Sequence, residues 1–83
     1  MRVNLADVLQ DRGDAAGAVE HLRAALKLEP RTAAWHNNLG VALAALGDIP
    51  AARLEFLQAL QLRPDYADAR DNLELARQTG GGP

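Results

Sequence analysis

Apolar residues recur along this chain at spacings of three and four positions, the pattern of one face of an α-helix. Short breaks divide that pattern. Gly13-Asp14 and Gly47-Asp48 each combine a glycine that ends one helix with an aspartate suited to cap the next. Pro30 and Pro64 each end a helix, because proline disfavours helical geometry in the residue before it. The breaks predict five antiparallel helices and no strands, near residues 3–12, 15–28, 33–46, 49–62 and 66–78.

The pattern also repeats at a fixed interval. Asn4, Asn38 and Asn72 are equally spaced, and the Gly-Asp pairs and the prolines recur at the same spacing. The period is about 34 residues, a size that indicates stacked supersecondary units, each of which buries its neighbour's apolar face. Such a stack favours a function in which an extended surface holds a partner over one in which a pocket carries out chemistry.

A helix, a Gly-Asp turn, a second helix and a proline within one such period resemble the tetratricopeptide repeat, whose signature is W-x2-L-G-x2-Y, then A-x3-F, A and P. The second copy carries most of this signature, at Leu39-Gly40, Leu43, Ala52, Phe56, Ala59 and Pro64. His36 stands at the Trp position, one residue after Trp35. The first copy matches at Leu5-Ala6, Leu9, Ala18, Leu22, Ala25 and Pro30. The third copy supplies only a first helix, in which Glu74 replaces the small residue.

The resemblance implies an all-α fold, a right-handed α-solenoid of helix-turn-helix repeats with two full repeats plus a C-terminal capping helix. The implied domain covers residues 1–79, with repeat 1 at about 1–32, repeat 2 at about 33–66, the capping helix at about 67–78 and a flexible tail at 80–83. Small signature residues such as Gly40 and Ala52 are expected where helices approach closely. Phe56 is expected to fill the space between the second unit and the last helix. Arg70, Glu74 and Arg77 give that helix the charged outer face of a terminal repeat.

In proteins that this chain resembles, the first helix of each unit lines a concave groove that holds an extended peptide. Carried over to this sequence, the peptide-binding groove is lined by Asn4, Asp7, Asp11, Asn37, Asn38, Val41, Asp68 and Asn72, with Asp71, Leu75 and Gln78 beside them. The periodic asparagines form either a ladder that hydrogen-bonds the peptide backbone or a set of amides that hold adjacent helices together. The acids at both ends of the groove either form a solvated helix face or give the groove a preference for a neutral or basic partner segment.

Part of the same family binds acidic chaperone tails through a clamp of lysine, asparagine and arginine. The corresponding positions here hold Val3, Asp7, Asn38, Asp68 and Asn72. Only Asn38 fits such a clamp, so the sequence argues against an acidic tail as the partner.

Composition and charge narrow the function further. The chain has neither cysteine nor serine, which removes disulfides, thiolate metal sites and two common nucleophiles. A net charge of −2 and the lack of an apolar run of ~20 residues point away from nucleic acid and membrane. His21 and His36 are too few for a metal site, and Asp7 with Asp11 lacks the enclosed pocket that catalysis needs. We therefore expect no catalysis, no metal, no cofactor and a cytoplasmic location.

Two functional interpretations remain open. One is a protein–protein interaction scaffold that binds a peptide segment, and the other is a structural or oligomerisation module or a fragment of a longer repeat solenoid. Apolar residues at the start of the chain, with no helix before them, favour a homo-oligomer formed through the N-terminal end; these residues are Met1, Val3, Leu5 and Val8. Trp35 and Tyr66 are expected to pack between repeats rather than to stack on a ligand.

Overall fold

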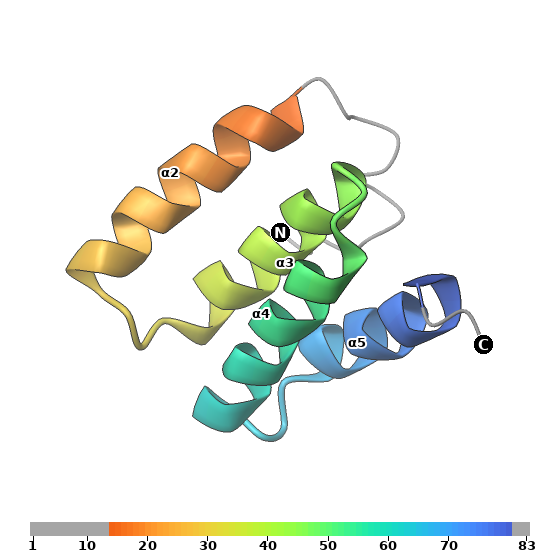
Figure 1. Cartoon of the computed structure of the whole chain (residues 1–83). Coiled ribbons are helices and arrows are strands. Elements are labelled where there is room, and N and C mark those ends of the chain that lie inside the picture. The colour runs from red at the N-terminus through yellow and green to blue at the C-terminus, as the bar shows by residue number, and fades with distance from the viewer. Residues whose placement is uncertain (1–13, 81–83) are drawn as a thin grey trace.

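Four helices follow one another in the computed structural model, which describes residues 14–80 (Figure 1). They are α2 (Ala15–Leu28), α3 (Ala33–Ala45), α4 (Ile49–Leu62) and α5 (Ala67–Gly80), and residues 14–80 contain no strand. The predicted ranges of α2 and α4 are confirmed, α3 ends one residue earlier than predicted, and α5 is shifted by one residue at its start and two at its end. The helix predicted at 3–12 lies outside the described residues.

Each helix packs mainly against the next one along the chain, and α3 also touches α5. This order makes α3 the central helix of the described part, with α2, α4 and α5 around it. The sequence of α3 suits that place, because from Leu39 onward it is apolar on every side. Every residue from Leu39 to Ala45 is buried. A helical segment without a polar face is stable only when neighbours cover it on all sides.

The turn between α3 and α4 shows why Gly47-Asp48 separates two helices. Gly47 has a φ of 91°, the only positive φ among the described residues. Its N–H donates to the carbonyl of Ala44, and the N–H of Asp48 donates to that of Leu43, both at 2.9 Å. These two bonds form a Schellman motif, which favours glycine at its left-handed position. The Asp48 carboxylate then accepts from the N–H of Ala51 at 3.3 Å, so it caps α4 as predicted.

The aspartate of the first Gly-Asp pair, Asp14, differs from Asp48 in how it meets its helix. Asp14 occupies the N-cap position of α2, but its side chain makes no capping hydrogen bond. The prediction from Asp14 is therefore right about where the helix begins and wrong about the capping bond. Asp14 has a φ of −98° and a ψ of −2°, whereas an N-cap residue typically has an extended backbone.

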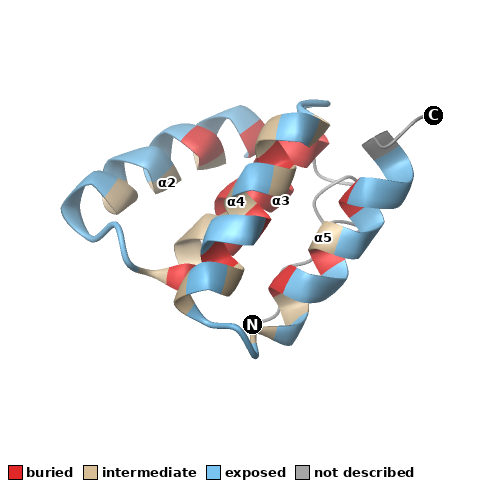
Figure 2. Cartoon of the chain, turned by 60° about the horizontal axis from the view of Figure 1, so that its bottom comes forward, coloured by how far each residue is buried: buried red, intermediate tan, exposed pale blue. Residues whose placement is uncertain are grey.

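The core is built around Phe56. Its side chain is 0% exposed and belongs to a cluster contributed by all four helices: Val19, Leu39, Val41, Ala42, Leu43, Ala44, Ala52, Phe56 and Ala76. Buried residues lie on the helix sides that face one another, and exposed residues cover the outside (Figure 2). The predicted place of Phe56, between the second unit and the last helix, agrees with a cluster that includes Ala76 of α5.

Gly40 provides the space that the Phe56 ring occupies. A Cβ built on Gly40 would lie 2.5 Å from Cε1 and 2.8 Å from Cδ1 of Phe56, closer than non-bonded carbons approach. The backbone oxygen of Ala52 would be only 3.0 Å away. The expectation that a small residue is needed here is therefore confirmed, and the reason is the aromatic ring of the facing helix.

Candidate functional site

Three of the predicted groove residues lie inside the protein rather than on a surface. Asn37 and Asn72 are each 1% exposed and Val41 is 0% exposed. In the described part of the chain Val41 is therefore covered and does not line an open surface, because α3 is enclosed by its neighbours. Asn38 and Asp68 are half-buried and remain accessible in part. Asn4, Asp7 and Asp11 lie outside the described residues, as does the predicted N-terminal association surface.

Asn37 and Asn72 are bonded to each other. The Nδ2 of Asn72 donates to the Oδ1 of Asn37 at 3.0 Å, and this bond joins α5 to α3 in the interior. The Tyr66 hydroxyl also bonds the Asn37 side chain. The interpretation in which asparagines hold adjacent helices together therefore describes Asn72. Its partner is Asn37, whereas the periodic sequence pattern pointed to Asn38.

Tyr66 lies where α3, α4 and α5 meet. It packs against the cluster of Ala33, Ala59 and Ala69, in agreement with the prediction of packing between repeats. The guanidinium carbon of Arg63 is 4.6 Å from the centroid of its ring, a cation–π contact. Burial, and then the negative charge of Asp68, raise the pKa of Tyr66 above 10.0, while Arg63 and the Asn37 bond oppose the rise.

Four residues along one side of α5 were predicted in or beside the groove and are at least partly accessible. We call them the α5 face: Asp68, Asp71, Leu75 and Gln78. Their spacings of three, four and three positions place them on one side of the helix. Leu75 is 42% exposed, although it stands one repeat after the buried Val41. The α5 face therefore offers one apolar side chain between two acids and an amide, and both acids also interact within the chain.

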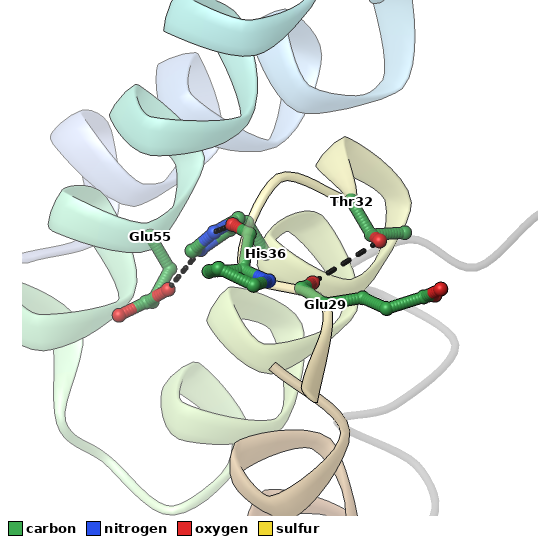
Figure 3. A network of polar contacts seen from close by, with 5 residues as sticks. Glu29, Thr32, His36 and Glu55 are labelled. Atoms are coloured by element: carbon green, nitrogen blue, oxygen red, sulfur yellow. Dashed lines mark hydrogen bonds and ion pairs between the residues drawn. The ribbon is translucent and has the colours of Figure 1, made fainter. Parts of the chain in front are cut away.

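His36 joins three segments of the chain (Figure 3). Its Nδ1 lies 2.8 Å from the Oε1 of Glu55 on α4, and its Nε2 lies 2.8 Å from the carbonyl oxygen of Pro30. Both partners are acceptors, so the ring donates to both only when it carries two protons. The other histidine, His21, is exposed on α2. Residues 14–80 contain no group of three side chains able to hold a metal ion.

Two exposed leucines on α4, Leu54 and Leu57, were not predicted as functional residues from the sequence. The helical pattern alone did not single them out, because isolated apolar residues are common on protein surfaces. A position-by-position comparison of the repeats would have done so. The equivalent positions one repeat earlier hold Glu20 and Arg23, both exposed. Within residues 14–80, no helix combines the length and apolar character needed to cross a bilayer.

Comparison with known proteins agrees with this architecture. The family described as "Tetratricopeptide repeat" matches residues 3–67. The chain is 36% identical over 74 residues to Protein FlbA of Caulobacter vibrioides, covering 89% of this chain and 12% of that protein. It is 49% identical over 51 residues to TPR repeat-containing protein PA4299 of Pseudomonas aeruginosa, covering 61% of this chain and 21% of that protein.

A further relative is covered by this chain over most of its own length. TPR repeat-containing protein PA0015 of Pseudomonas aeruginosa is 32% identical over 75 residues, which cover 90% of this chain and 71% of that protein. No solved structure matches the chain significantly. The chain belongs to the tetratricopeptide repeat family.

Proposed function

We propose that this chain, as a member of a family whose repeats mediate protein–protein interactions, binds an extended peptide segment of a partner protein along the α5 face. The observation that supports the proposal is the exposure of Leu75, at 42%, between the exposed polar residues Asp71 and Gln78. An apolar contact with acids beside it suits a segment in which a hydrophobic side chain alternates with neutral or basic ones. Domains of this family are typically non-catalytic scaffolds.

Of the two periodic asparagines among the described residues, Asn38 is the one that remains partly accessible for this role. The amide of Asn72 is bonded to Asn37 in the interior, whereas Asn38 is half-buried on α3. An amide offers both a donor and an acceptor to a peptide backbone, independent of the peptide's side chains. We therefore assign backbone recognition to Asn38, and the preference for a basic or neutral segment to Asp68 and Asp71.

The second candidate is a structural module within a longer repeat array. The observation in its favour is the length of the relatives, since the chain spans only 12% of Protein FlbA and 21% of PA4299. In that case the α5 face and the core would serve mainly to stack further units, as repeats do in solenoids. A structural module would bind no peptide with a preference for charge.

The test is a titration of the full chain with two extended peptide pools, one rich in lysine and leucine and one rich in glutamate and leucine. We expect the lysine pool to bind more tightly, and we expect Leu75→Ser to weaken that binding about tenfold, or ~1.4 kcal/mol. Leu28→Ser is the matched control, because Leu28 is 85% exposed on α2, away from the α5 face.

Asn38→Ala tests the assignment of backbone recognition. We expect it to weaken the binding of both pools by a similar factor, because an amide that bonds the peptide backbone does not distinguish side chains. Equal affinity of Asn38→Ala and the unchanged protein would contradict the role given to Asn38. No binding of either pool, together with a mass above that of the monomer in sedimentation, would favour the structural module instead.

A further inference from the structure

A second accessible surface lies between α4 and α5, separate from the α5 face. It is a groove of about 480 Å³ lined by Pro50, Arg53, Leu54, Leu57, Leu73 and Arg77. Leu54 is 64% exposed and Leu57 is 45% exposed. The lining combines apolar side chains with two arginines and contains no carboxylate. Exposed leucines grouped in this way are typical of an interaction surface.

The repeat indicates the shape that fits this groove. One repeat earlier, Val19 of α2 and Leu43 of α3 share a core cluster with Ala52 and Phe56 of α4. The part of the equivalent surface formed by Val19 and Leu43 is therefore covered by α4, whereas Glu20 and Arg23, the equivalents of Leu54 and Leu57, remain exposed. Because α4 and α5 stand in the same sequence relation as α2 and α3, the groove between them has the framework that receives a helix.

Two positions that are apolar on α2 and α3 are occupied by arginine on α4 and α5. Arg53 stands one repeat after Val19, and Arg77 stands one repeat after Leu43. A helix with a purely apolar face would cover two guanidinium groups without giving either a hydrogen-bond partner, which is unfavourable. A carboxylate on the incoming helix would form a charge-assisted bond with either arginine. The groove therefore favours a helix that is both apolar and acidic.

Glu74 limits how deeply such a helix can lie. It occupies on α5 the position that Gly40 occupies on α3. Gly40 accommodates the Phe56 ring at a distance that no Cβ could tolerate. A helix on α5 consequently cannot approach as closely as α4 approaches α3. This difference argues against a repetition of the α3–α4 pairing as the occupant.

We propose that the groove between α4 and α5 binds an amphipathic helix of a partner protein, with leucine-like side chains on one face and carboxylates beside them. The apolar face packs on Leu54, Leu57 and Leu73, and the carboxylates pair with Arg53 and Arg77. The partner of this groove differs in both shape and charge from the extended basic or neutral segment assigned to the α5 face.

The experiment uses two labelled helical peptides and the full chain. Each peptide has about 18 residues with leucines at helical i, i+3, i+4 and i+7 spacing, and is held helical by a side-chain bridge. One carries glutamates beside the leucines and the other carries lysines at the same positions. Fluorescence anisotropy is expected to show that the glutamate peptide binds at least about tenfold more tightly, with an affinity that falls as salt is added.

Variants place that binding in the groove. Leu57→Glu is expected to weaken the glutamate peptide about tenfold or more, and Arg77→Glu to reverse the preference between the two peptides. Leu28→Glu and Arg23→Glu on α2 are the matched controls, because both side chains are exposed and neither lines the groove. Circular dichroism confirms that each variant keeps its helix content.

Three results would overturn the proposal. The first is equal affinity for the two peptides or no binding of either. The second is an unchanged affinity of Leu57→Glu, which would place the peptide elsewhere. The third is a dimer of the unchanged protein in sedimentation that Leu57→Glu dissociates, which would make a second copy of this chain the occupant.

Discussion

Gly40 is expected to tolerate no larger residue, although it lies inside a helix where alanine is normally the better choice. Gly40→Ala adds one methyl group at a point 2.5 Å from the Phe56 ring and 3.0 Å from the Ala52 backbone oxygen. The ring is 0% exposed and packs within a cluster drawn from four helices, so it cannot move without disturbing its neighbours. The backbone oxygen cannot move without shifting α4.

Two opposing contributions decide how much Gly40→Ala changes the free energy of unfolding. Alanine favours the helical backbone over glycine by about 1 kcal/mol. Overpacking a filled core costs about 1–3 kcal/mol, and the rigid contacts on two sides of Gly40 place this case at the upper end of that range. We expect a net loss of about 2 kcal/mol in the free energy of unfolding. For a domain of this size, that loss lowers the Tm by about 8–16 °C.

Thermal unfolding followed by circular dichroism measures the effect, and Gly17→Ala is its control. Gly17 is exposed in α2 and has no atom within 4 Å of an added Cβ. That variant should gain about 0.5–1 kcal/mol from the backbone alone. Phe56→Leu introduced beside Gly40→Ala should recover part of the loss, because the two residues are in contact. A Gly40→Ala protein that melts as high as Gly17→Ala would refute the packing of Phe56 on Gly40.

Three further outcomes are expected. Phe56→Ala should cost about 3–5 kcal/mol in a chemical denaturation, and a change below about 1 kcal/mol would show that Phe56 is not central to the core. Tyr66 should titrate above pH 10.0 in its absorbance spectrum, with Asp68→Asn lowering the midpoint. Because the pKa of Tyr66 is raised in the folded protein, its neutral hydroxyl contributes stability that is complete below pH 10.0 and is lost as the pH rises through the folded pKa. A titration midpoint at or below 10.0 would contradict the assigned burial of Tyr66. Asn72→Ala should lower the free energy of unfolding by about 1–3 kcal/mol, because it removes a hydrogen-bond partner of the buried Asn37. Unchanged stability would show that this bond does not hold α3 to α5.

The sequence predicted the helices of the described part closely because their ends depend on local chemistry. A Schellman motif at Gly47, a cap at Asp48 and a proline after α4 each act within a few residues, so the pattern alone reveals them. The need for a small residue at Gly40 was likewise predicted from the repeat. The capping bond of Asp14 was not predicted correctly, because the presence of a suitable side chain does not fix the backbone dihedrals at its position.

The candidate site was harder to predict, because it depends on which sides of a helix are covered. The family pattern placed Val41 and Leu75 at equivalent positions of one groove, yet Val41 is buried and Leu75 is 42% exposed. Among the described residues, α3 packs against α2, α4 and α5, whereas α5 packs mainly against α4. The pairing of Asn72 with Asn37 likewise depends on how α3 and α5 are rotated against each other, which the period of the sequence does not specify.

Departures from the repeat carry more functional information than the repeat itself. Positions that keep their character from one copy to the next are those that the stack needs, and they would be the same in any protein of this architecture. Glu74 in place of Gly40 changes a close helix contact into an exposed charge, and Leu57 in place of Arg23 changes a charge into an exposed apolar side chain. Neither substitution improves the packing of residues 14–80, and exposing Leu57 to water has a cost. A partner that covers Leu57 would remove this cost, and both substitutions lie along α4 and α5, where the proposed helix would bind.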